Sequence, residues 1–107
     1  ENNRWLLELA MNNREPIEMR KKALFWAGQS RGTSMDDLAA MYSKTDDREM
    51  KEQVIFVYSQ RRDASAADKL MDIAKNDKDK ELRKKAIFWL SQSRDPRVAK
   101  FLEELIG

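Results

Sequence analysis

The residues able to do acid–base or nucleophilic chemistry here are carboxylates and hydroxyls, because the 107-residue chain contains no His and no Cys. The commonest general base and the thiolate ligands of zinc are therefore missing, and no serine has an imidazole to activate it. Three pairs of adjacent acids remain, at Asp36–Asp37, Asp46–Asp47 and Glu103–Glu104. Neighbours on a helix point about 100° apart, so such pairs form no catalytic dyad. We expect no enzyme active site, no metal site and no cofactor.

Positive charge is concentrated in residues 17–31, 48–62 and 80–94, and the remainder is net acidic, so the whole chain reaches only +2. A nucleic-acid groove needs an uninterrupted track of Lys and Arg. Here each basic segment is followed by acidic turns that suit helix capping. We therefore do not expect nucleic acid to be the partner. No apolar run approaches the ~18 residues of a bilayer-spanning helix, so we expect no membrane span.

One stretch of sequence recurs three times along the chain. Leu82–Arg94 reads LRKKAIFWLSQSR, Met19–Arg31 reads MRKKALFWAGQSR, and Met50–Arg62 reads MKEQVIFVYSQRR in a weaker form. Successive copies begin 31 and 32 residues apart. A fixed period of this length is typical of a solenoid of stacked supersecondary units.

Each unit is predicted to be a pair of helices. The recurring stretch supplies the first helix, and segments with apolar residues at three- and four-residue spacing supply the second, at residues 34–44, 65–76 and 96–106. Residues 1–13 carry the same second-helix pattern, because Leu6 and Ala10 align with Leu70 and Ala74 two periods later. We therefore predict an all-α fold of seven helices.

The same alignment predicts one repeat domain over residues 1–107. Its parts are the second helix of a truncated repeat at 1–15 and complete repeats at 16–46, 47–78 and 79–107. Because the chain opens midway through a repeat, we expect it to be a segment of a longer protein.

Residues with capping chemistry mark the predicted helix starts. Pro16 suits a first helical turn, where its missing N–H would have no partner, and Asp95 before Pro96 makes an N-cap and first-turn pair. A hydroxyl N-cap three residues before an acid approximates a capping box. This pattern occurs at Ser34 with Asp37 and at Ser65 with Asp68.

The faces of the first helix follow from a rotation of about 100° per residue. The arc predicted to face the second helix contains Leu82, Ala86, Trp89 and Leu90, whereas Lys84 points away. Trp26 occupies the position of Trp89 in an earlier repeat. We expect both tryptophans to lie in the core, and the methionines to fill gaps there.

One aromatic recurs outside this arc, at Phe25, Phe56 and Phe88. In a solenoid each first helix also touches the first helices before and after it, which widens its buried surface. We expect these rings to pack between neighbouring repeats; an exposed aromatic row for a partner is the alternative. Trp5, in the truncated repeat, is expected to be exposed.

The period, the helix pair and an apolar–Arg–x–x–Ala pattern opening the first helix resemble HEAT repeats of the short bacterial kind. The residues that carry it are Met19, Arg20 and Ala23, then Leu82, Arg83 and Ala86, with Met50, Lys51 and Val54 as the divergent copy. The resemblance covers nearly the whole chain and implies a right-handed α-solenoid of antiparallel helix pairs. It also implies a small residue near the end of each first helix, matched by Gly28, Ser59 and Ser91. Finally, it implies a ladder in which Arg20, Lys51 and Arg83 pair with turn acids, the candidates being Asp47, Asp63, Asp79 and Asp95.

We interpret the chain as a non-catalytic scaffold, a module whose partner is a protein or peptide held on the concave surface of the second helices. The expected contact residues are outward positions of successive second helices, namely Asp37, Lys44, Lys69, Asp72, Lys100 and Glu104. Two alternatives stay open. One is a structural spacer within a longer repeat protein, and the other is binding of nucleic acid or an anionic surface through the basic first helices.

Overall fold

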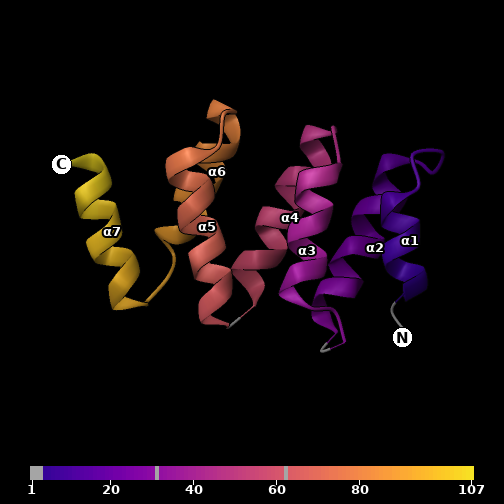
Figure 1. Ribbon diagram of the computed structural model, residues 1–107, viewed down its shortest axis with the longest axis horizontal. Coiled ribbons are helices and arrows are strands. Elements are labelled where there is room, and N and C mark those ends of the chain that lie inside the picture. Colours follow the sequence, from indigo (N-terminus) through magenta and orange to yellow (C-terminus); the bar gives the residue numbers. More distant parts are fainter. Residues whose placement is uncertain (1–3, 31, 62) are drawn as a thin grey trace. The chain divides into compact units, whose positions relative to one another are not determined.

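The computed structural model describes residues 4–30, 32–61 and 63–107. Within these ranges the chain forms seven α-helices and no strand (Figure 1). Their bounds are α1 Arg4–Met11, α2 Ile17–Gln29, α3 Met35–Lys44, α4 Arg48–Gln60, α5 Ala64–Asn76, α6 Lys80–Leu90 and α7 Pro96–Ile106. The all-α fold and its seven helices are confirmed for the described part of the chain. We call α2, α4 and α6 the A helices, because they contain the recurring stretch, and α1, α3, α5 and α7 the B helices.

The chain forms two compact units, residues 1–57 and 58–107, with the boundary inside α4. In the first unit α2 packs along α1, so a B helix and the following A helix form a close pair. In the second unit α6 packs along α5 in the same way, and α7 also contacts α5. The residue ranges assigned to individual repeats remain a prediction.

The predicted inner face of the last A helix is confirmed. Leu82, Ala86 and Leu90 are each at most 2% exposed, whereas Lys84 is exposed. Trp89 is half-buried, beside this core. The spacing of four residues therefore locates the apolar stripe correctly.

The prediction that Trp26 lies in the core is wrong, because its side chain is 61% exposed. The buried residues of α2 are Arg20, Ala23, Leu24, Ala27 and Gly28, and the indole lies outside this stripe. Among them, Gly28 lets Val57 of α4 approach the α2 backbone. Trp26 instead makes an edge contact with Phe25, with ring centroids 5.4 Å apart.

Two of the three recurring phenylalanines pack between neighbouring A helices, as predicted. Phe25 of α2 and Phe56 of α4 are stacked, with centroids 6.1 Å apart and ring planes at 21°. Close approach of the same helices is visible at Gly28, where an added Cβ would collide with Val57. For Phe88 the prediction is wrong, since this ring is 54% exposed and contacts Trp89 of its own helix.

Local capping explains several helix starts. The capping box at α3 is confirmed: the Asp37 N–H donates to Ser34 Oγ at 3.0 Å, and the Ser34 N–H donates to Asp37 Oδ2 at 3.2 Å. Asp95 caps α7, accepting from the Arg97 N–H at 2.9 Å, with Pro96 in the first turn as predicted. Pro16 is the N-cap residue of α2, just before the first turn expected for it.

The predicted cap of α5 is wrong. The N-cap residue is Asp63, and α5 begins at Ala64, so Ser65 already has helical backbone and its hydroxyl cannot serve as the cap. Asp68, the expected partner of Ser65, accepts a hydrogen bond from Arg97 Nη1 at 3.0 Å instead. The preference for pairing Asp68 with α7 could not be seen in the local sequence.

Candidate functional site

The cation near the start of each A helix interacts with the preceding B helix or the turn that follows it. Arg20 of α2 donates from Nε to the carbonyl oxygen of Ala10 in α1 at 3.0 Å. Arg83 of α6 donates from Nη1 to the carbonyl oxygen of Asp77, the C-cap residue of α5, at 2.6 Å. Lys51 of α4 lies over the ring of Tyr42 in α3, with Nζ 4.5 Å from the centroid. The recurring cation thus ties each A helix to the B helix before it.

The expected ladder of Arg and turn Asp side chains is therefore corrected for Arg20 and Arg83, whose acceptors are main-chain carbonyl oxygens. A helix C-terminus leaves carbonyls unpaired and carries negative partial charge, so a guanidinium is a suitable donor there. Three of the candidate acids cap helices: Asp47 accepts from the Glu49 N–H, Asp79 from the Glu81 N–H and Asp95 from the Arg97 N–H. The fourth, Asp63, pairs with Arg61 at 3.5 Å.

All six side chains predicted to contact a partner are exposed, and they fall into two groups. Asp37 and Lys44 lie on α3 in the first unit, where Asp37 also belongs to the capping box. The other four lie in the second unit, with Lys69 and Asp72 on α5 and Lys100 and Glu104 on α7. The α5 and α7 groups lie on helices that contact each other. Their role in binding stays a prediction.

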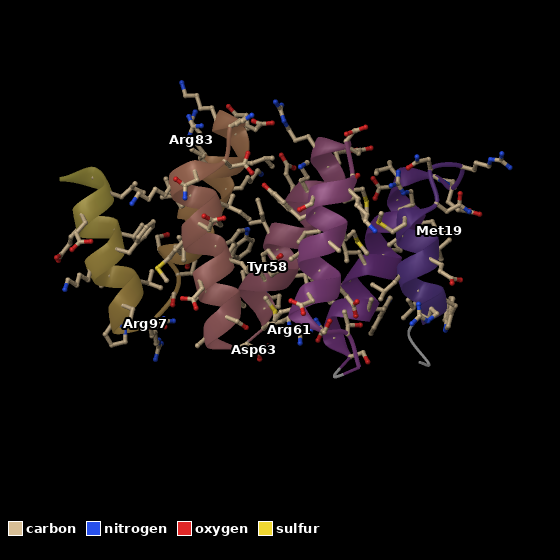
Figure 2. The ribbon with its side chains drawn as sticks, in the orientation of Figure 1. Met19, Tyr58, Arg61, Asp63, Arg83 and Arg97 are labelled. Atoms are coloured by element: carbon tan, nitrogen blue, oxygen red, sulfur yellow. The ribbon has the colours of Figure 1, made fainter. Side chains whose placement is uncertain are left out.

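The second unit contains a pocket of about 360 Å³ where A and B helices meet. Figure 2 labels three residues of its lining, Tyr58, Arg61 and Asp63. The pocket lies among the last turn of α4, the α4–α5 turn, the first turns of α5, the end of α6 and the α6–α7 turn. Its apolar lining is Tyr58, Ala64, Ala67, Leu70, Trp89 and Leu90, and its polar lining is Ser59, Gln60, Arg61, Asp63, Gln92, Ser93 and Asp95.

Charges around this pocket are paired within the protein. Arg61 bonds Asp63, and Arg97 bonds both Asp95 and Asp68 at 3.0 Å. The side-chain hydrogen bond from Arg97 holds the pKa of the Asp95 carboxyl below its usual value. Burial raises the pKa of the Tyr58 phenol to about 12, so it stays protonated at neutral pH. Neither group is placed to exchange protons with a substrate near neutral pH.

Two glutamines give the pocket neutral hydrogen-bonding groups in corresponding places. Gln60 Nε2 donates to Ser59 Oγ at 3.2 Å, and Gln92 Nε2 donates to Ser91 Oγ at 3.4 Å. Both glutamines are exposed, as is Gln29 at the same position of the first recurring stretch. No role was assigned to this position from the sequence alone. The sequence nevertheless contained a signal for this position. Glutamine occurs there in all three copies of the recurring stretch, although an exposed position is not constrained by core packing.

The described residues were also searched for groups of metal ligands and for bilayer-spanning helices. Across residues 4–30, 32–61 and 63–107, no group of three or more acidic side chains is placed to hold a metal ion. None of the described helices is both long and apolar enough to cross a bilayer.

Paired helices with a recurring internal stretch define this chain as an α-helical repeat protein. A family model for HEAT repeats matches residues 35–107, and the chain belongs to the HEAT repeat family. The resemblance carried by the apolar–Arg–x–x–Ala pattern is thereby confirmed, and with it the helical solenoid class. Comparison with curated proteins and with solved structures found no match. HEAT repeats are generally protein-interaction scaffolds and are typically non-catalytic.

Proposed function

We propose that this chain is a non-catalytic interaction module that holds a peptide segment of a partner protein against its second unit. The observation that carries the proposal is the pocket among α4, α5 and α6, whose lining combines apolar side chains with hydrogen-bonding groups. Its volume of about 360 Å³ lies at the small end of the ~300–1,000 Å³ range of ligand pockets. That size suits one or two side chains of a bound peptide.

The pocket lining favours a peptide over a charged small molecule. Arg61 is already paired with Asp63, and Asp95 with Arg97, so an incoming ion would have to compete with these contacts. Gln60 and Gln92 each carry both donors and acceptors, which match the N–H and C=O groups of an extended backbone. Trp89, which is half-buried, adds an aromatic surface of the kind enriched at interaction sites.

Charged side chains on α5 and α7 form the proposed rim of this binding surface. Lys69 and Asp72 lie on α5, the helix that lines the pocket with Ala67 and Leu70. Lys100 and Glu104 lie on α7, and the four side chains include both signs of charge. Rim charges of mixed sign set the orientation and association rate of a partner more than its affinity. Asp37 and Lys44 on α3 are proposed as a separate contact surface of the first unit.

The nucleic-acid alternative is less well supported by the contacts of the basic A helices. Arg20 is only 6% exposed and bonds the Ala10 carbonyl, and Arg83 bonds the Asp77 carbonyl. These two arginines therefore contribute to internal packing, and mainly the lysines beside them remain for phosphates. A spacer role, the other alternative, predicts no peptide binding at all.

Selection from a random peptide library displayed on phage tests the proposal. We expect enriched peptides that bind the purified chain with a Kd of about 10⁻⁵ M or tighter. The double variant Gln60→Ala, Gln92→Ala should weaken binding at least about tenfold, because it removes both amides from the pocket walls. Gln29→Ala is the matched control, since it removes the corresponding exposed amide in the first unit.

Three results would contradict the proposal. Selection that enriches no binding peptide would favour the spacer. If the pocket variants bind peptide as well as the unchanged chain does, the binding site is not the pocket. The surface of α3 would then be the next candidate. Binding of duplex or single-stranded oligonucleotides would favour the nucleic-acid alternative if it were tighter than the ~10⁻⁶ M limit of non-specific contacts and strongly dependent on salt.

A further inference from the structure

Arg20 of α2 is a buried cation whose guanidinium end has no partner among the described residues. The residue is only 6% exposed. Its Nε donates to the carbonyl oxygen of Ala10 at 3.0 Å, which uses one of the several N–H donors of the group. The terminal nitrogens Nη1 and Nη2 form no hydrogen bond or ion pair with any residue that the structure describes. Because buried arginines are ordinarily paired, we expect these nitrogens to have an acceptor that comes from a ligand.

The corresponding arginine of the last A helix, Arg83, uses its guanidinium differently. This residue is half-buried, and its Nη1 donates to the carbonyl oxygen of Asp77 at 2.6 Å. In Arg20 the bond to the backbone comes from Nε, nearer the stem of the side chain, so the forked end stays free. Attachment of an A helix to the preceding B helix therefore does not explain the free end of Arg20.

The free end of Arg20 can be reached from a pocket of about 440 Å³ in the first unit, which this residue lines. Neither Nη1 nor Nη2 is sealed from solvent. The rest of the lining comes from the end of α1, the α1–α2 turn, the end of α3 and the α3–α4 turn, and consists of Met11, Asn13, Lys44, Thr45, Asp46 and Asp47. A ligand in this pocket therefore has access to the guanidinium.

The charges around this pocket favour a ligand with a single carboxylate. The lining has no formal net charge, because its two cations are balanced by Asp46 and Asp47. Asp47 Oδ1 accepts from the Glu49 N–H at 2.8 Å, whereas the exposed Asp46 has no bond to a described residue. Both acids would repel a multiply charged anion such as phosphate. A carboxylate with an N–H group beside it supplies one negative charge for the guanidinium fork and a donor for Asp46.

A second, more apolar pocket adjoins the first, because the two share Met11 and Lys44 in their linings. It has a volume of about 150 Å³, lies between α1 and α3, and is lined by Leu7, Met11, Asp37, Ala40, Met41 and Lys44. Its size suits one side chain. A C-terminal amino acid has its carboxylate and its side chain on the same Cα atom, so it can place one group in each of two adjoining pockets.

We propose that the first unit binds the C-terminal carboxylate of a partner peptide on Arg20, with the apolar last side chain of that peptide between α1 and α3. Lys44, which lines both pockets, adds attraction for the carboxylate. Arg20 is recessed, so the end of a peptide can reach it but the backbone phosphates of a duplex cannot. This site is separate from the pocket of the second unit, because the two linings have no residue in common.

N-acetyl-leucine is the probe for this site, because it combines a free carboxylate, an adjacent N–H and one apolar side chain. It is titrated into the isotope-labelled chain, and NMR follows the Nε–H signal of Arg20 and the backbone N–H signals of Ala40 and Thr45. We expect saturable shifts with a Kd of about 10⁻³ M, the range of a ligand of this size. N-acetyl-leucine amide lacks the carboxylate and N-acetylglycine lacks the side chain, so each should bind at least about tenfold more weakly.

Variants of the chain test where the probe binds. Arg20→Lys keeps the charge but loses the planar fork, so binding should weaken at least about tenfold. Ala40→Leu fills the apolar pocket from an exposed position and should weaken binding of N-acetyl-leucine but not of N-acetylglycine. Its matched control is Ala99→Leu, at an exposed position of α7. Lys44→Glu should weaken binding mainly at low salt, whereas Lys75→Glu, in the last turn of α5, should not.

Four outcomes would overturn the inference. Binding of the acid and its amide with equal affinity would exclude a carboxylate site, and binding that neither Arg20→Lys nor Ala40→Leu weakens would place the probe elsewhere. Tighter binding of inorganic phosphate would indicate a general anion site. Equal binding of N-acetyl-aspartic acid α-amide, whose carboxylate is in the side chain, would favour an internal acidic residue over a C-terminus. The pocket variant Gln60→Ala, Gln92→Ala should leave all of this binding unchanged, so this site and the proposed function fail independently.

Discussion

Arg20 Nε lies 3.0 Å from the carbonyl oxygen of Ala10, and both residues are buried between α1 and α2. Because a buried carbonyl without a donor is costly, Arg20→Met should lower the free energy of unfolding by about 1–3 kcal/mol. Lys22→Met, which removes an exposed cation from the same helix, is the control and should have little effect. Urea denaturation measures both. Equal effects would mean that the bond from Arg20 contributes nothing beyond its charge.

Leu90 is 1% exposed on the inner face of α6, so Leu90→Ala should destabilise the chain by about 2–5 kcal/mol. Lys84→Ala on the opposite face breaks only an exposed 3.8 Å contact with Glu81, and such contacts are worth about 0–1 kcal/mol. Thermal unfolding of the two variants should therefore differ clearly. Similar shifts in Tm would be incompatible with the face assignment.

The close approach of α2 and α4 at Gly28 predicts a coupling with Val57. A Cβ at residue 28 would overlap Val57 Cγ1 and lie 3.2 Å from its Cγ2. Gly28→Ala gains about 1 kcal/mol of helix propensity but loses a comparable amount to displacement of Val57, so its net effect should be small. In a Val57→Ala background the same change should be stabilising. A double-mutant cycle by urea denaturation measures the coupling, and additive effects would refute it.

Stability at alkaline pH should depend on Tyr58. Its pKa is raised from 10.0 to about 12 by burial, so the unfolded chain loses the phenolic proton at lower pH than the folded chain does. The contribution of Tyr58 to the free energy of unfolding is therefore complete below pH 10 and decreases as the pH rises from about 10 to 12. The Tyr58→Phe variant should lack this part of the decrease. Identical pH profiles between pH 9 and 12 for the two proteins would be evidence against a raised pKa.

Arg97 should control the ionisation of Asp95. The hydrogen bond between these side chains lowers the pKa of Asp95 below its ordinary 3.8. Arg97→Gln should return the Asp95 pKa toward that value, which carboxyl chemical shifts in NMR would report. The lowered pKa stabilises the fold above the unfolded pKa of 3.8, and this stabilisation is lost as the pH falls through the folded value. An Asp95 pKa that does not change in the variant would assign the shift to another group.

The fold could be predicted from sequence because its determinants are local or repeated. Period, apolar spacing and caps such as Ser34 with Asp37 each depend on residues close in the chain, and the seven described helices lie where these signals place them. The face of α6 was found for the same reason, since one helix turn fixes the relation between Leu82, Ala86 and Leu90.

The predictions from sequence were wrong where the burial or the partner of a residue depends on which other helix packs against it. Trp26 and Trp89 occupy corresponding positions, yet the first is exposed and the second half-buried. Trp89 lines the pocket with residues of α4 and α5, whereas Trp26 contacts Phe25 of its own helix. Asp68 pairs with Arg97 of the next B helix, a contact between residues 29 positions apart. The pocket also depends on the spatial meeting of turns, although its exposed glutamines left a visible pattern in the sequence.

Arg20 and Arg83 donate to backbone carbonyl oxygens, so their hydrogen bonds do not depend on the side chain of the residue that accepts them. A carbonyl is present whatever residue stands at 10 or 77, so substitution there is limited by shape and not by the need to keep a carboxylate. Paired charges would require two residues to change together during divergence or engineering. Here one cation suffices, which lets consensus design lengthen this array by copying its A helices without matching an acid to each new arginine.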